Sequence, residues 1–237
     1  MTAARKRTAI LISGRGTNMA RLIEAAQDAS YPVEIVGVIS DVPKAPGLIF
    51  AADKGIGTAA IPRSDYSSKE AHDAAIDAAL RVLGADIVCL AGYMRILTPR
   101  FVEGWEGKLI NIHPALLPSF KGLDTHRRAL EAGVRIHGCT VHFVTAETDD
   151  GPIIAQAAVP VLTGDDEASL AARVLKAEHE LYPHALRLVA EGKAAMVAGR
   201  TVFANLSEDP RDGNSRLFSP GSWDEELDFE ALARFTP

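Results

Sequence analysis

Asn111 and His113 are the residues whose types and spacing most directly suggest chemistry. They alternate with isoleucines in a short apolar segment over residues 108–113. Successive side chains of an extended strand point to opposite faces, so these two side chains share one face. Pro114 and Pro118 end the strand, because proline has no backbone N–H to offer a sheet. An amide and an imidazole together at a strand end predict a reactive site, with a plain solvent-exposed strand end as the alternative.

A glycine-containing loop, GRGTN at residues 14–18, follows an expected buried strand at 8–13 and precedes an expected helix at 19–29. Glycine lets the backbone approach a ligand closely, and the free N–H groups of a helix amino end favour an anion. The loop is half of a dinucleotide fingerprint, because Met19 stands at the third glycine position. We therefore predict a phosphate site, with an ordinary tight turn as the alternative.

Asp41 follows the next expected strand, at residues 33–40, where a nicotinamide-binding fold places the acidic ligand of a ribose. A dehydrogenase or another nucleotide-binding module is therefore an alternative function. The absent third glycine argues against it, since a smaller monophosphate fits the loop without that glycine.

The remaining sequence alternates apolar strand-like runs with helical patterns, which is typical of an α/β fold with a doubly wound, mostly parallel sheet. Such sheets bind ligands at the carboxyl ends of their strands, where the loop at 14–18, a loop at 92–97 and the pair Asn111 and His113 meet. The last two strands are expected to pair antiparallel, because their connection is too short for a crossover. The other expected strands are 58–61, 85–91, 108–112, 137–144 and 153–159, and the other expected helices are 47–54, 67–83, 124–132 and 166–191.

Carboxylates occur at two further places of interest. An acidic turn contains Glu147, Asp149 and Asp150, of which one could pair with His113 while the others are solvated. Glu178 lies on the apolar stripe of the last long helix, where a carboxylate is costly unless it is paired or binds a ligand. We favour a role for it in binding hydroxyl groups, with a buried ion pair as the alternative.

The composition argues against several classes of protein. The 237 residues carry a net charge of −6, and a pI near 5.7 is at odds with the basic face that nucleic-acid binding normally needs. The first apolar run is too short for a signal peptide or a membrane span, so we expect a cytoplasmic protein. Cys89 and Cys139 are expected to be buried thiols, and no metal site is expected. The histidines other than His113 are assigned structural or packing roles: His72, His126, His137, His142, His179 and His184.

Five motifs together resemble the phosphoribosylglycinamide formyltransferases, which are folate-dependent enzymes of purine biosynthesis. The motifs are LISGRGTN (11–18), AGYMRIL (91–97), NIHPALLP (111–118), GLDTH (122–126) and VHFVT (141–145). The resemblance covers about residues 8–204. It implies a Rossmann-like formyltransferase domain at 1–204, followed by an extension at 205–237 that packs on the domain or is mobile.

The resemblance implies transfer of a formyl group from 10-formyltetrahydrofolate to the amine of 5'-phosphoribosylglycinamide, by direct attack through a tetrahedral intermediate. It implies small-molecule partners, no nucleic acid, membrane or metal, and a monomer or homodimer. The implied catalytic residues are Asn111, His113 and Asp149. The implied binding residues are Gly16, Thr17 and Asn18 for the substrate phosphate, Glu178 for its ribose, and Lys69, Met94, Arg95, Ile96 and Leu97 for the folate.

Three features depart from the pattern of that family. Lys69 stands where the family often has arginine, so a planar bidentate contact would be lost. Asp150 stands where a glycine often follows the catalytic aspartate, and the tail after residue 204 is longer than in compact members. A formyltetrahydrofolate hydrolase shares the implied trio and is the nearest alternative, although it usually has an additional amino-terminal domain. A methionyl-tRNA formyltransferase would need a basic carboxyl-terminal domain, whereas this tail contains many acidic residues.

Overall fold

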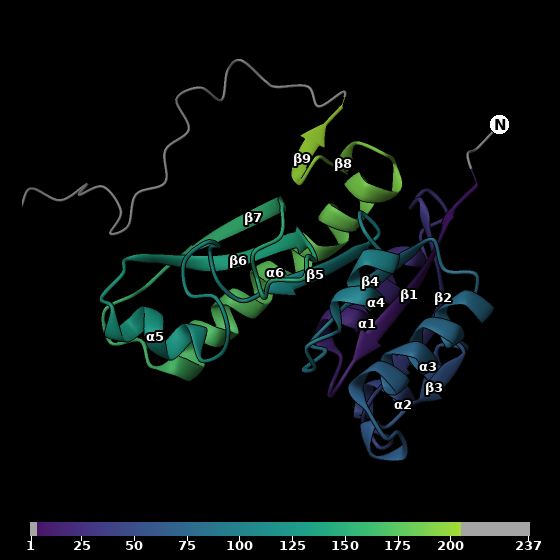
Figure 1. Cartoon of the computed structure of the whole chain (residues 1–237). Helices are drawn as coiled ribbons and strands as arrows, with labels where there is room; N and C mark the ends of the chain where they lie inside the picture. The colour runs from purple at the N-terminus through teal and green to yellow at the C-terminus, as the bar shows by residue number, and fades with distance from the viewer. Residues whose placement is uncertain (1–3, 205–237) are drawn as a thin grey trace, which may run out of the picture.

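A computed structural model describes residues 4–204, and the extension expected at 205–237 lies outside that range. Its centre is a seven-stranded sheet with the strand order β3-β2-β1-β4-β5-β6-β7 (Figure 1). The strands from β3 to β5 in that order are parallel, which confirms the predicted mostly parallel sheet. The strands are β1 (Lys6–Ile12), β2 (Val33–Ser40), β3 (Thr58–Ala60), β4 (Ile87–Leu90), β5 (Leu109–His113), β6 (Ile136–Phe143) and β7 (Ile153–Pro160).

The carboxyl-terminal strands of the sheet depart from the parallel arrangement. The predicted antiparallel pairing of β6 with β7 is confirmed, and β6 also runs antiparallel to β5. This second pairing places Asn111 opposite His142 and His113 opposite Thr140. The strand that carries the amide and the imidazole is therefore flanked by a parallel neighbour on one side and an antiparallel neighbour on the other.

Alternate residues of β1 pack into two separate cores, one on each face of the sheet. Ile10 and Ile12 belong to the core that contains Met19, whereas Ala9 and Leu11 belong to the other. Side chains of a strand alternate between faces, so the continuous apolar run at residues 9–12 must be covered on both faces. Three helices pack against the first core: α1 (Thr17–Ala26), α2 (Pro46–Asp53) and α6 (Glu167–Ala190). Two helices pack against the second core: α3 (Lys69–Val82) and α4 (Pro99–Gly104). The remaining helical elements are α5 (Thr125–Glu131) and the 3-10 turn η1 (Arg63–Asp65).

Helix α1 begins two residues earlier than the sequence pattern predicts. Gly16 precedes it with φ 68°, a left-handed conformation that glycine adopts without strain, and its carbonyl accepts the Ala20 N–H at 2.9 Å. The turn into the helix is therefore complete before Met19. Helix α4 and a hairpin of β8 (Ala194–Val197) and β9 (Arg200–Phe203) were not predicted, because each is too short for a clear periodicity.

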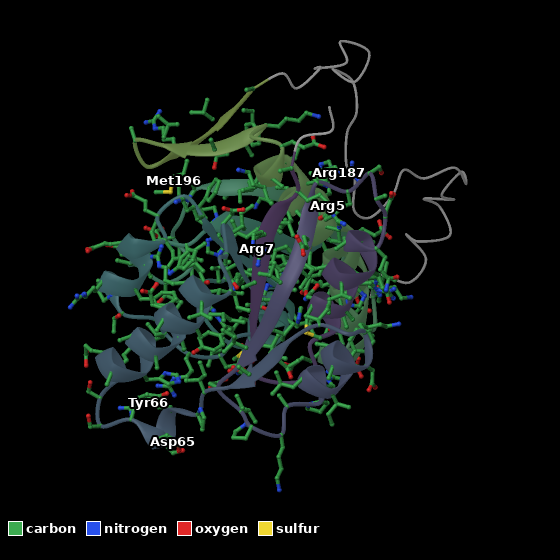
Figure 2. All side chains as sticks on the ribbon, turned by 90° about the vertical axis from the view of Figure 1, so that its right-hand side faces the viewer. Arg5, Arg7, Asp65, Tyr66, Arg187 and Met196 are labelled. Carbon is green, nitrogen blue, oxygen red and sulfur yellow. The ribbon has the colours of Figure 1, made fainter. Side chains whose placement is uncertain are left out.

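The amino-terminal end of the sheet is closed by structural contacts. Figure 2 shows Arg5 and Arg187 near this end, with Asp65 and Tyr66 near the opposite end. The Arg187 guanidinium lies 4.9 Å from the centre of the Tyr31 ring, and the Tyr31 hydroxyl donates to the Pro183 carbonyl at 2.7 Å. These contacts join α6 to the amino-terminal end of the sheet, whereas β4 and β5 lead into their loops at the opposite, carboxyl-terminal edge.

Candidate active site

A cavity of about 660 Å³ opens at the carboxyl-terminal edge of the sheet. This volume falls within the range of small-molecule sites. Its walls come from segments far apart in sequence: residues 92–97 after β4, 111–114 at the end of β5, 122–126 before α5, and 144–149 after β6, with Asn18 from α1 and Glu178 from α6. The doubly wound topology thus brings the predicted segments to one place.

His113 is held at the end of β5 with a carboxylate at one ring nitrogen. The side chain is buried, and its Nδ1 lies 3.3 Å from Oδ2 of Asp149. Its Nε2 lies 3.0 Å from the backbone carbonyl of Phe120. Both neighbours are acceptors, so the arrangement suits an imidazolium that donates from both ring nitrogens.

Asp149 is the carboxylate of the acidic turn that the structure places beside His113. Its backbone has φ 52°, a left-handed conformation that aspartate tolerates better than most residues but that still costs about 1 kcal/mol or more. The Gly122 N–H donates to Asp149 Oδ2 at 2.9 Å. Of the other two carboxylates, Glu147 is exposed and Asp150 pairs with Lys121. Asp149 alone of the three is oriented for chemistry with the histidine.

His142 contacts the amide of Asn111 from the neighbouring strand. Its Nδ1 lies 2.9 Å from the Phe143 carbonyl and therefore carries the proton, which leaves the lone pair of Nε2 to accept from Asn111 Nδ2 at 3.3 Å. Burial lowers the pKa of His142, which favours this neutral form. The Asn111 side-chain oxygen then points away from His142 Nε2, and the second hydrogen on Asn111 Nδ2 remains available to a ligand.

The sequence pattern gives His142 and His126 only structural roles, whereas both line the cavity. His126 packs edge-on against His137, with ring centres 5.4 Å apart. Burial lowers the pKa of His126 and lowers that of His137 to about 4. The missing information is the antiparallel register of β6 against β5, because this register alone places His142 opposite Asn111.

The turn that follows β5 is fixed by two polar side chains. Thr140 Oγ1 donates to the Ala115 carbonyl at 2.7 Å and accepts the Leu117 N–H at 3.0 Å. Gln156 Nε2 donates to the Leu117 carbonyl at 2.9 Å and to Thr140 Oγ1 at 3.0 Å. These bonds satisfy backbone groups that no sheet neighbour reaches, and they hold the chain directly after His113.

Asn18 and Glu178 form a second polar pair in the cavity. Asn18 Nδ2 donates to Glu178 Oε2 at 2.6 Å, and Glu178 is only 7% exposed. Burial raises the pKa of Glu178, while the hydrogen bond from Asn18 acts in the opposite direction. Its partner in the described part of the chain is thus an amide rather than the cation of a buried ion pair.

The glycine loop shapes the amino end of α1. A Cβ added to Gly16 would lie 2.9 Å from Met19 Cε, so the loop closes directly over the Met19 side chain. Met19 is fully buried, which explains how the third glycine position of the fingerprint is filled without blocking the loop. Gly16 and Thr17 do not line the cavity, whereas Asn18 does. The free N–H groups of the first turn of α1 remain available to an anion.

The loop at 92–97 forms an apolar rim. Four of the five residues implied for folate line the cavity, namely Met94, Arg95, Ile96 and Leu97, and Met94 and Ile96 are 67% and 66% exposed. Lys69, at the start of α3, does not line it.

One hydroxyl connects this rim to the glycine loop. Ser13 Oγ accepts the Met94 N–H at 2.9 Å and donates to Asp41 Oδ1 at 2.6 Å. Asp41, which a dehydrogenase would use for a ribose, is therefore engaged by the chain itself.

The described residues contain no helix long and apolar enough to cross a membrane. Within residues 4–204, three or more metal-binding side chains do not gather at any one place.

The comparison with known proteins agrees with the doubly wound sheet and with the amide, imidazole and carboxylate at its edge on the class of protein. The model of the formyl transferase family matches residues 6–186, so the chain belongs to the formyl transferase family. The resemblance to the phosphoribosylglycinamide formyltransferases is confirmed by two relatives. The enzyme of that name from Escherichia coli is 44% identical over 187 residues, which are 79% of this chain and 88% of the relative. The solved structure of the Brucella melitensis enzyme is 58% identical with a TM-score of 0.77, and covers 82% of this chain and 99% of its own.

A longer relative places the same unit within a larger protein. The trifunctional purine biosynthetic protein adenosine-3 of Gallus gallus is 50% identical over 186 residues, which are 78% of this chain. The chain spans 18% of that protein. The similarity is therefore to one segment of the trifunctional protein, whereas it extends over most of the bacterial enzymes.

Proposed function

We propose that this chain transfers the formyl group of 10-formyltetrahydrofolate to the amine of 5'-phosphoribosylglycinamide. The observation that supports this most is the position of Asn111, His113 and Asp149 between two different binding surfaces of one cavity. One surface contains Asn18 and Glu178 beside the amino end of α1, and suits a ribose phosphate. The other is the apolar rim at 92–97, which suits an aromatic ring system.

The reaction requires stabilisation of one negatively charged oxygen. The amine nitrogen attacks the formyl carbon, and the formyl oxygen becomes an oxyanion. The C–N bond to the folate then breaks, and a proton passes from the amine to the folate nitrogen. Donors aimed at such an oxyanion contribute about 3 kcal/mol each to transition-state stabilisation. Asn111 Nδ2 and the His113 imidazolium are the donors in this proposal.

Asp149 has two roles in this mechanism. Its carboxylate stabilises the imidazolium of His113, and it accepts and returns a proton as the amine loses its charge. In the free chain Nε2 of His113 already donates to the Phe120 carbonyl. The oxyanion therefore shares this hydrogen with Phe120 or displaces that carbonyl when the tetrahedral species forms.

We propose that the binding residues are those that the resemblance implies, on and beside these two surfaces. Backbone N–H groups of Gly16, Thr17 and Asn18 hold the phosphate, and the Glu178 carboxylate accepts hydrogen bonds from the ribose hydroxyls. The rim at 92–97 holds the folate ring. Lys69, outside the cavity, attracts the carboxylates of the folate tail.

The wider setting follows from the same reaction. We propose a cytoplasmic enzyme of de novo purine biosynthesis that acts as a monomer or homodimer. It uses folate as a co-substrate and needs neither a metal nor a nucleic-acid partner.

Three alanine substitutions test the catalytic assignment. Asn111→Ala, His113→Ala and Asp149→Ala should each lower kcat by about 100-fold or more, because each removes a group from the transition state. Near-normal kcat in all three variants would contradict the assignment.

Tetrahydrofolate release, followed spectroscopically with and without the ribonucleotide, tests the reaction class. We expect release only when the amine is present. Release that does not depend on the amine would instead indicate a formyltetrahydrofolate hydrolase, and tight binding of NAD without folate binding would indicate a dehydrogenase.

A further inference from the structure

Residues 120–122, called here the positioning segment, contact both members of the histidine–aspartate pair. The Phe120 carbonyl lies 3.0 Å from Nε2 of His113. Two residues later, the Gly122 N–H donates to Oδ2 of Asp149 at 2.9 Å. One short stretch of backbone thus fixes the imidazole from the side opposite to the carboxylate, and fixes the carboxylate itself.

Lys121 lies between these two backbone contacts and forms an ion pair with Asp150. Asp150 follows Asp149 directly in the acidic turn, so this ion pair connects the positioning segment to the turn at a third point. The hydrogen bond from Lys121 lowers the pKa of Asp150 and keeps it ionised. The side chains of Lys121 and Asp150 are 39% and 44% exposed, so the pair contributes little to overall stability.

The positioning segment is itself attached to α5. Arg128 Nη1 donates to the Lys121 carbonyl at 2.6 Å, and the Arg128 guanidinium lies 5.7 Å from the centre of the Phe120 ring. Phe120 and Gly122 have φ 56° and 82°, so the segment is a tight bend rather than an extended loop. These contacts fix the position of the segment, which in turn contacts the acidic turn.

The acidic turn is fixed at its other end by close packing. A Cβ on Gly151 would lie 1.7 Å from the Phe143 carbonyl, so the backbone of Gly151 rests directly against the end of β6. Asp149, two residues earlier, has φ 52°, and its carboxylate contacts His113 and the Gly122 N–H. Without the Lys121 ion pair, the positioning segment would hold the acidic turn only through the Gly122 N–H and the contacts of His113.

We propose that Lys121 and Asp150 are positioning residues that hold Asp149 against His113 in the catalytically active geometry. Neither side chain needs to touch substrate in this role, because both act through the Asp149 backbone. The proposal rests on the proposed formyl transfer, for which the orientation of Asp149 matters. It also gives a function to Asp150, the carboxylate of the acidic turn that directly follows Asp149.

The test compares Lys121→Met with the charge-swapped variant Lys121→Asp/Asp150→Lys. We expect Lys121→Met to lower kcat about fivefold, with KM for both substrates and the melting temperature unchanged, since only the orientation of Asp149 is disturbed. The charge-swapped variant restores the ion pair and should recover most of kcat. Lys121→Arg should retain wild-type kcat, because it keeps the positive charge.

Lys193→Met provides a matched control. Lys193 pairs with Glu191 at 2.8 Å, its side chain is 44% exposed, and both residues of this ion pair directly follow α6 rather than belonging to the acidic turn. It should leave kcat unchanged. If Lys121→Met proves unstable, Asp150→Asn removes the same ion pair from the other side and should show the same fall in kcat at constant KM.

Two results would overturn the proposal: wild-type kcat in Lys121→Met, or a charge-swapped variant as slow as the single variant. Both results are interpreted by comparison with a wild-type enzyme that transfers formyl groups. Absence of formyl transfer by the wild-type chain itself would instead refute the proposed function, so the two failures can be told apart.

Discussion

Two carboxylates in the same cavity are positioned in opposite ways. Glu178 extends from the middle of the 24-residue helix α6, is buried, and accepts from one amide. Asp149 lies on a turn with positive φ and is held by a backbone N–H and a histidine. Helix packing fixes the first, whereas local contacts fix the second. In the proposed mechanism, the carboxylate that only binds is part of a rigid helix, whereas the one that takes part in proton movement lies on a turn held by local contacts.

The largest expected effect is that of Asp149→Asn. This substitution keeps the shape and removes the charge beside His113, so the imidazolium loses its stabilising partner. We expect kcat to fall about 1,000-fold with KM changed little. Steady-state kinetics measure this, with Asp150→Asn as the neighbouring control for loss of a charge from the same turn. Equal losses in the two variants would remove the distinction between Asp149 and its neighbour.

Glu178→Gln should have the opposite kinetic signature. Loss of a charge-assisted bond to the ribose should raise KM for the ribonucleotide about tenfold or more, with a smaller effect on kcat. The free energy of unfolding should rise by about 1 kcal/mol at neutral pH, because a buried charge without a cationic partner is removed.

The pH dependence of unfolding checks the Glu178 environment independently. Burial raises the pKa of Glu178 in the folded chain, so the folded state binds the proton more tightly than the unfolded state. Its contribution therefore favours folding below the ordinary pKa of 4.5, and this contribution is lost as the pH rises through the raised pKa. In denaturant titrations at several pH values, the free energy of unfolding of Glu178→Gln should lack this pH-dependent contribution. A variant less stable than the wild type at neutral pH would indicate that the carboxylate is better compensated than its surroundings suggest.

His142→Leu should have an intermediate effect, because it removes the acceptor that orients Asn111. We expect kcat to fall about tenfold, and His142→Gln to recover part of it through its side-chain carbonyl. Burial lowers the pKa of His142, so the unfolded state binds its proton more tightly. The neutral His142 side chain therefore contributes stability above the ordinary histidine pKa of 6.5, and this contribution is lost as the pH falls from 6.5 through the lowered pKa. His142→Leu should unfold with a shallower dependence on pH over this interval.

The smallest expected effect is that of Lys69→Ala. Lys69 lies outside the cavity lining, so its charge acts on folate only through solvent. We expect KM for the folate to rise about twofold at low salt and less at high salt. A tenfold rise would mean that Lys69 contacts the folate directly in the complex.

The sequence was sufficient to predict the sheet edge and several of the residues that meet there, among them Asn111, His113 and the loop at 92–97. Alternation with isoleucines places Asn111 and His113 on one face, and parallel strands bring their carboxyl ends together. These inferences depend on local periodicity and simple topology. The same reasoning predicts that Glu178 is buried, because its helical stripe is apolar.

The remaining features depend on contacts between distant segments. His142 reaches Asn111 through a strand register that no local pattern specifies. The local pattern does not distinguish the three carboxylates of the acidic turn, and only the family resemblance pointed to Asp149. In the structure, the contact with His113 and the bend at residues 120–122 distinguish Asp149 from Asp150. The earlier start of α1 follows from the left-handed conformation of one glycine, Gly16. Tertiary contacts of this kind cannot be deduced from spacing alone.

The hydroxyl of Ser13 gives the two binding surfaces a common support. It accepts from Met94 in the apolar rim, and it belongs to the residue directly before the glycine loop. A ligand that orders one of these loops therefore lowers the entropy that the other loop still has to lose on binding. Such coupling is reciprocal: in the proposed reaction, the ribonucleotide would tighten folate binding by the same factor as folate tightens ribonucleotide binding. The shared hydroxyl would then couple the two binding events in addition to the direct contact between the reacting atoms.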